Sequence, residues 1–196
     1  MKPMKHLLLA VLIGTTLCRA QSQAPLPDMT KTDITALSDF DGARVAFRGF
    51  HLGLGRQAAI TKLNAMKDLT WDFDAFNTPS QSPASTTEMR IYVHLKNTAG
   101  VKDPAVLYLI WDAGQKGISS IVFYKAAEPM LAGNTGRLFT TDALDKACTC
   151  RQFLNGEAEE TKDNIGITLY RYKAQHFELI SMPDEGGRMV WFKLIR

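Results

Sequence analysis

Two cysteines two positions apart, Cys148 and Cys150, are the strongest candidates in this sequence for a reactive or disulfide-forming pair. In an oxidising compartment two such thiols are expected to pair. Residues two apart on a helix point in nearly opposite directions, so a bond between them would end the helix or strain the ring. Three interpretations stay open: a strained local disulfide, two independent thiols, or a redox or metal-binding pair. The redox interpretation lacks the Cys-x-x-Cys spacing that lowers a thiol pKa at a helix start.

The histidines and a pair of aspartates are weaker candidates for a metal site or for catalysis. His51, His94 and His176 lack the close spacing of a zinc site, so we predict no metal. His51 lies beside a glycine-rich turn and is the best placed of the three to face a cleft. Asp72 and Asp74 share one face of an expected strand, about 7 Å apart. Such a pair can do acid–base work in a glycosidase, but alternation on a solvated sheet face explains it more simply.

Motifs of nucleophilic and nucleotide chemistry are absent from the sequence. There is no Gly-x-Ser-x-Gly elbow and no Ser-x-x-Lys pair. Neither a dinucleotide fingerprint nor a phosphate-binding glycine loop occurs. The sequence therefore predicts no cofactor and favours a protein that is not an enzyme.

The N-terminus has the order of a cleavable export signal. A basic start is followed by an apolar run over 7–17, shorter than the ~20 residues that a spanning helix needs. Small residues then precede a cut after Ala20. A lipoprotein with its anchor on Cys18 is the alternative, but Leu17 holds the place where a small residue is expected. We therefore expect a periplasmic or secreted protein.

Removal of the export signal also changes the charge. The chain has 23 basic and 20 acidic residues, and Lys2, Lys5 and Arg19 belong to the signal. The mature chain then carries as many acidic as basic side chains, without a basic run. Nucleic acid is therefore not an expected partner. No later apolar stretch reaches membrane-spanning length, so we expect no transmembrane segment in the mature chain.

Alternation of apolar and polar residues predicts mostly strands. The expected strands cover 71–75, 91–95, 106–111, 118–124, 167–172, 176–181 and 188–195. Short turns, such as the glycine-containing 184–187, favour an antiparallel meander. Three- and four-residue apolar spacing predicts one helix from Gly55 to about Lys67, and Thr141 is the expected cap of a second helix that continues through Arg151. Both helices need the sheet to cover their apolar sides.

These elements predict an α+β fold with a curved antiparallel sheet and two short helices packed on one face. Residues 1–20 would be the signal and 21–43 a flexible leader. A single domain would span 44–196. Helix-then-strands occurs twice, so a tandem repeat with halves at 44–128 and 137–195 is an alternative description.

The segment 49–63, GFHLGLGRQAAITKL, resembles a strand-to-helix turn of exported bacterial domains. The families are the β-lactamase-inhibitor-protein-like domains and the small assembly lipoproteins of the outer-membrane β-barrel machinery. Gly53 and Gly55 allow the sharp turn, while Leu54 stands where Met is common. The resemblance implies a role in binding or assembling proteins of the cell envelope, because those relatives act through surface contact.

Outward-facing aromatic side chains on the sheet are the expected contact points, because Tyr and Trp are enriched at interaction hot spots. The candidate binding residues are Tyr92, Tyr108, Tyr170, Tyr172 and Trp191, together with His51. The predicted function is non-catalytic protein binding in the envelope or outside the cell. Two alternatives remain: a redox protein that uses Cys148 and Cys150, and a binder of a small lipid or sugar.

Overall fold

The structure is a computed structural model that describes residues 24–76, 80–96, 104–145, 149–154, 158–184 and 187–196. Eight strands form one antiparallel sheet, and the class is α+β, as the sequence predicts. The strands are β1 (Leu69–Phe73), β2 (Met89–Leu95), β3 (Ala105–Trp111), β4 (Ser120–Phe123), β5 (Glu159–Lys162), β6 (Thr168–Tyr172), β7 (Phe177–Asp184) and β8 (Gly187–Ile195).

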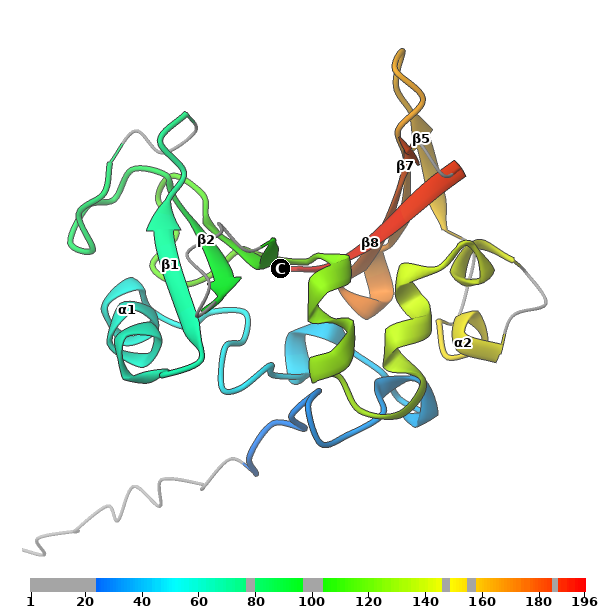
Figure 1. The fold of residues 1–196 in the computed structure, drawn as a ribbon, viewed down its shortest axis with the longest axis horizontal. Coiled ribbons are helices and arrows are strands. Elements are labelled where there is room, and N and C mark those ends of the chain that lie inside the picture. The colour runs from blue at the N-terminus through cyan, green and yellow to red at the C-terminus, as the bar shows by residue number, and fades with distance from the viewer. Residues whose placement is uncertain (1–23, 77–79, 97–103, 146–148, 155–157, 185–186) are drawn as a thin grey trace, which may run out of the picture.

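Two four-stranded meanders meet in the middle of the sheet. The strand order is β1-β2-β3-β4-β8-β7-β6-β5, so the last strand of each meander pairs with that of the other. Each meander falls within one of the two expected halves; their descent from a duplication stays a prediction. In Figure 1 the outer strands rise on either side of the central pair, while α1 and α2 lie lower. The sheet is therefore an open trough, not a barrel.

The strands form because apolar side chains alternate along them. In β2, for example, Met89, Ile91 and Val93 are buried, while the residues between them are half-buried. The inward side chains of the central strands build an aromatic core in which Phe123 and Phe192 stack at 4.5 Å and Phe177 lies 5.8 Å from Phe192. This core ties the two meanders together.

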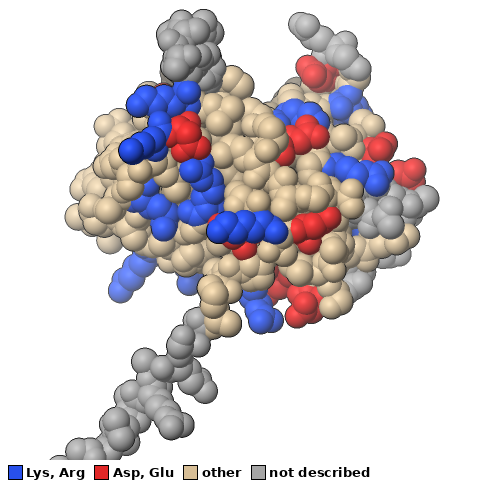
Figure 2. Space-filling model, turned by 60° about the horizontal axis from the view of Figure 1, so that its bottom comes forward, with Lys and Arg blue, Asp and Glu red and all other residues tan. Residues whose placement is uncertain are grey.

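Helical segments cover one face of the sheet. The α-helices are α1 (Arg56–Ala65) and α2 (Thr149–Gln152), and the 3-10 helices are η1 (Ile34–Ala36), η2 (Gly42–Arg44), η3 (Lys125–Met130), η4 (Gly133–Phe139), η5 (Thr141–Leu144) and η6 (Lys173–Gln175). Helix α1 matches the predicted first helix, with Ala59 and Leu63 buried as the spacing indicated. Figure 2 looks onto this side, where blue Lys and Arg side chains gather over one half.

The second predicted helix is different in the structure. Thr141 begins η5, a 3-10 helix that ends at Leu144, and α2 begins separately at Thr149. Thr141 is not the cap: Thr140 holds that place and its side chain makes no capping hydrogen bond. The helix does not continue because Asp145, the residue after η5, is extended, with φ −71° and ψ 124°.

The prediction of a flexible leader is wrong for its described part. Asp28 bridges Ala46 in parallel, and Met29 and Ile34 are completely buried. The polar composition at its start, with Pro25 and Pro27, suggested a linker, but three of its apolar side chains, Met29, Ile34 and Phe40, belong to the core. The segment therefore closes the helix-covered side of the sheet.

No helix in the described parts of the chain is both long and apolar enough to cross a bilayer. Residues 1–20, for which the sequence predicts an export signal with cleavage after Ala20, lie outside the described residues, so this stays a prediction.

Candidate binding surface

The face of the sheet turned away from the helices, here called the open face, lies on the inside of the trough (Figure 1). Because neighbouring strands pair in register, its side chains form rows that cross the sheet. One row crosses every strand, and its members face each other in pairs from β5 to β1. These are Glu159, Arg171, Glu178, Lys193, Val122, Tyr108, Tyr92 and Asp72.

The β5–β8 half of this row is charged and internally neutralised. Glu178 is almost fully buried, and its carboxylate receives Arg171 Nε at 2.5 Å and Lys193 Nζ at 3.2 Å. Glu159 is held by Lys173 at 2.8 Å, and this contact lowers the pKa of the Glu159 carboxyl. A buried charge needs partners of this kind. These side chains therefore neutralise one another, and little net charge remains in this half of the row to attract a ligand.

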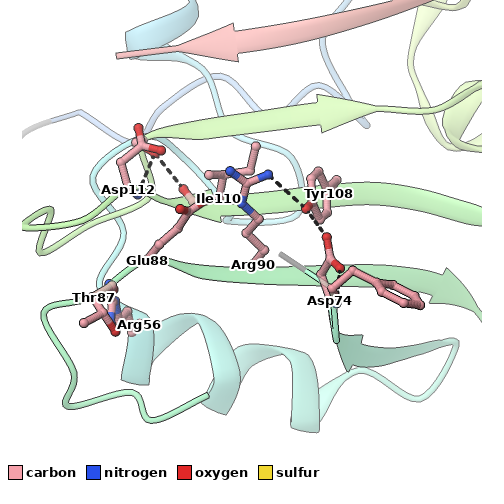
Figure 3. Close-up of polar contacts among 10 residues, drawn as sticks. Arg56, Asp74, Thr87, Glu88, Arg90, Tyr108, Ile110 and Asp112 are labelled. Carbon is pink, nitrogen blue, oxygen red and sulfur yellow. Dashed lines mark hydrogen bonds and ion pairs between the residues drawn. The ribbon is translucent and has the colours of Figure 1, made fainter. Parts of the chain in front are cut away.

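The other half of the row carries a tyrosine pair above a buried carboxylate. Tyr92 and Tyr108 stack with ring centroids 4.3 Å apart. The Tyr108 hydroxyl donates to Asp74, and Arg90 Nη1 lies 3.5 Å from that hydroxyl oxygen (Figure 3). Burial and the bond to Asp74 raise the pKa of Tyr108. Tyr108 therefore keeps its proton and acts as a fixed donor rather than as a base.

Asp74 corrects one expectation from the sequence. We expected both carboxylates of the Asp72 and Asp74 pair on a solvated face. Asp72 is exposed and contacts His94 at 3.1 Å, but Asp74 is only 3% exposed and accepts the Phe76 backbone N–H at 3.0 Å. Asp74 thus fixes the chain where it leaves β1.

A second anchor holds the loop over 80–88, here called the clamped loop. Arg56, at the start of α1, is buried and donates to the backbone carbonyls of Ser85 and Thr87. Figure 3 shows Arg56 and Thr87 together at the end of the sheet. Burial lowers the pKa of Arg56. The guanidinium reaches both carbonyls because its donors form a planar fork.

Next to the charged row lies an apolar row. Leu169 faces Ile180, and Ile180 faces Trp191, all three of them half-buried. Tyr124 continues the row with its ring edge-on to Trp191 at 4.6 Å. Met182 and Met189 pair beyond it on β7 and β8. This half-buried apolar strip is the part of the open face suited to contact with a partner.

The apolar row ends in a hollow of about 350 Å³, here called the Trp191 hollow. It is lined by Tyr92, Pro104, Ala105, Tyr124, Lys125, Ala126, Met189 and Trp191. A larger hollow of about 820 Å³ lies where the central strands end, and its lining is polar. His176, which pairs with Asp41 at 2.8 Å, and the charges around Glu178 border that second hollow. The open face therefore has an apolar and a polar region.

The structure separates the aromatic residues singled out from the sequence. Tyr92, Tyr108 and Trp191 lie on the open face. Tyr170 and Tyr172 lie on the opposite, helix-covered face, so their expected outward position is wrong. Tyr172 is 2% exposed in the core and Tyr170 packs against the core. Arg151 of α2 lies over both rings, which explains why this end of the sheet is covered.

His51 also lies apart from the other candidates. Its Nδ1 is 2.9 Å from the Leu52 carbonyl oxygen, and its side chain borders a hollow against Leu26 and Ala46 of the N-terminal segment. Cys148 and the side chain of Cys150 lie outside the described residues, so the disulfide, thiol and redox interpretations stay predictions. Within the described residues no group of His, Cys, Asp and Glu could hold a metal ion.

Three members of the apolar row were missed from the sequence: Leu169, Ile180 and Tyr124. The signal was present, because Ile180 and Trp191 alternate with core residues along strands joined by a short turn. Counting outward in steps of two from the turn at 184–187 pairs them. Tyr124 follows from its place just after Phe123, which points into the core.

Comparison with family models, with curated proteins and with solved structures finds no match to this chain. The function must therefore be argued from the open face itself.

Proposed function

We propose that this chain is an exported, non-catalytic protein-binding domain that acts in the bacterial cell envelope or outside the cell, and that it holds its partner on the open face. The observation that carries the proposal is the half-buried apolar row of Leu169, Ile180 and Trp191 along the inside of the trough. Such a strip, bordered by polar groups, is the usual make-up of a protein contact.

The polar groups of the open face favour binding over catalysis. The Glu178 carboxylate is held by two cations, and the Tyr108 hydroxyl is held between Asp74 and Arg90. A raised pKa keeps Tyr108 protonated. These groups are arranged to keep their protons and partners, whereas a catalytic group must exchange them.

The test is capture with matched surface variants of residues 21–196. The bait carries Ile180→Arg, which places a charge in the apolar row, or Ile165→Arg, which changes a side chain that is 73% exposed. We expect one envelope or secreted protein to be retained by the wild type and by Ile165→Arg, and to be lost with Ile180→Arg. Circular dichroism of both variants checks that the fold is kept.

Two results would overturn the proposal. One is a partner retained equally by the wild type and by a folded Ile180→Arg variant, because binding would then lie elsewhere. The other is that no protein is retained above a bead-only background by the wild type.

A further inference from the structure

Basic side chains gather where β1 begins, next to α1. The Asp68 carboxylate accepts Arg48 Nη1 at 2.7 Å and Arg48 Nη2 at 2.9 Å. The Asp68 backbone carbonyl accepts the Lys96 backbone N–H at 2.8 Å, and Lys67 directly precedes Asp68 in the chain. Lys67 and Lys96 are both exposed. Three basic residues from separate segments are thus brought to one end of β1.

Two further lysines extend this group. Lys62 of α1 has its Nζ over Gly49, 2.8 Å from the position that a Cβ would take there. Asp28 accepts the Arg48 backbone N–H at 3.2 Å. Burial raises the pKa of the Asp28 carboxyl, but its hydrogen bonds and the nearby charge of Lys31 outweigh this effect. The whole group, here called the basic patch, consists of Lys31, Arg48, Lys62, Lys67 and Lys96 with the carboxylates of Asp28 and Asp68.

The basic patch is not electrically balanced. Its five cations and two carboxylates leave an excess of three positive charges. Arg48 is paired with Asp68, whereas the four lysines form no salt bridge with any described residue. Figure 2 shows the same imbalance, because Lys and Arg gather over the half of this side that contains α1. Elsewhere in the helical layer the cations are paired, as Arg137 is with Asp142 at 3.7 Å.

The residue types of the basic patch favour a lipid surface over a protein partner. Four of its five cations are lysines, and its single arginine is already held by Asp68. Lysine is depleted in protein interfaces, where arginine and aromatic side chains supply the anchors. Lysine instead carries a compact, hydrated charge on a flexible stem. Such charges are attracted to the diffuse field of anionic headgroups without a fixed geometry.

We propose that the basic patch docks this domain reversibly on an anionic lipid surface, with the lysine ammonium groups facing the headgroup phosphates. Each lysine near such a surface strengthens association about fivefold, so an excess of three charges gives about a hundredfold preference over a neutral bilayer. The inference goes beyond the proposed function and does not depend on it. In Figure 1 α1 and the start of β1 lie below the trough, so a domain docked in this way keeps its open face accessible.

Co-sedimentation with protein-free vesicles tests the docking. The protein is residues 21–196, because this range holds every described element and omits the apolar run over 7–17, which would itself bind lipid. The vesicles contain phosphatidylcholine alone, or phosphatidylcholine with an equal amount of phosphatidylglycerol. At low salt we expect binding to the anionic vesicles to be about a hundredfold tighter than to the neutral ones. This binding should be lost in about 1 M salt, where the Debye length is about 3 Å.

Matched double variants locate the contact. Lys67→Gln with Lys96→Gln removes two exposed charges of the basic patch and should weaken binding to the anionic vesicles about 25-fold. The control is Lys162→Gln with Lys173→Gln, which removes the same charge near β5, at the opposite edge of the sheet from β1. The control should change binding by less than about twofold. Circular dichroism checks that both variants keep the fold.

Four outcomes would overturn the docking surface. The first is no binding to anionic vesicles at low salt, and the second is equally tight binding to neutral vesicles. The third is an equal effect of the two double variants, because binding would then follow net charge and not the basic patch. The fourth is a single-stranded DNA oligonucleotide bound as tightly as the anionic vesicles, because the patch would then attract any polyanion. None of these outcomes affects the capture test of the open face.

Discussion

Asp33 holds the N-terminal segment to the helical layer, and its removal tests whether that segment is part of the fold. Its carboxylate accepts the Thr35 backbone N–H at 3.0 Å, which caps η1. It also accepts the Asn134 backbone N–H at 2.7 Å, from η4, and lies 3.4 Å from Thr135 Oγ1. One carboxylate thus joins two segments about a hundred residues apart in sequence.

The cost of Asp33→Ala follows from these bonds. Loss of an N-cap costs about 1 kcal/mol, and loss of a hydrogen bond to a charged group costs about 1.5–3 kcal/mol. We therefore expect the free energy of unfolding to fall by about 3 kcal/mol, allowing for the partial exposure of the site. Asp39→Ala is the matched control, because Asp39 is exposed in the same segment. It should change the free energy by no more than about 0.5 kcal/mol.

Urea unfolding followed by circular dichroism measures both variants, and pH adds an independent check. Burial raises the pKa of Asp33, but the hydrogen bonds from Asn134, Thr35 and Thr135 outweigh it, so the folded pKa lies below the ordinary aspartate value of 3.8. A depressed carboxyl pKa stabilises the folded state above the unfolded pKa. This contribution is lost as pH falls through the folded pKa. The difference between the wild type and Asp33→Asn should therefore shrink below pH 3.8.

A single result would refute this reasoning. If Asp33→Ala costs no more than Asp39→Ala, the bonds to η4 do not stabilise the fold, and the N-terminal segment behaves as the flexible leader that its composition suggested.

Three further substitutions test other contacts. Tyr108→Phe removes the donor to the buried Asp74 carboxylate and should lower the free energy of unfolding in urea by about 1–3 kcal/mol. A loss below about 0.5 kcal/mol would contradict that contact. Arg56→Lys replaces the planar fork that donates to the two carbonyls of the clamped loop with a single ammonium on a flexible stem, so amide exchange in that loop should speed up by more than in β3. Equal amide protection of the loop in the wild type and the variant would argue against the clamp. Gly117→Ala would place a Cβ against the backbone of Gly53, so we expect loss of soluble protein; normal yield with an unchanged melting temperature would be the contrary result.

The sequence predicted the strands better than the segments that cover them. Alternation along Met89–Leu95 is a local property of the chain, and the structure shows the same alternation as burial. The turn between β7 and β8 was equally readable, because it contains glycine between two strand patterns. The N-terminal segment could not be read in this way. Its buried residues Met29, Ile34 and Phe40 have no period, and they are fixed by contacts with distant parts of the chain.

The candidate site shows a second limit of the same kind. Tyr170 and Tyr172 were correctly placed on one face of their strand, but the face was the wrong one. Alternation along a strand shows which residues share a face, but it does not show which of the two faces is covered. That choice depends on where the helical segments lie, and in this case on Arg151 of α2 over both rings. Trp191 was assigned to the correct face, but its unused donor is visible only in three dimensions.

Trp191 differs from the charged side chains of the open face in how its polar group is satisfied. Polar side chains on an uncovered sheet face can satisfy one another. Arg171 and Lys193 do so by pairing with the Glu178 carboxylate. Trp191 does not follow that pattern, because its buried N–H has no acceptor in the described chain. Phenylalanine would pack against Tyr124 and Ile180 without leaving a donor unsatisfied. The indole N–H of Trp191 is therefore a local cost to the fold, while the rest of this half-buried side chain contributes to the apolar row of the open face.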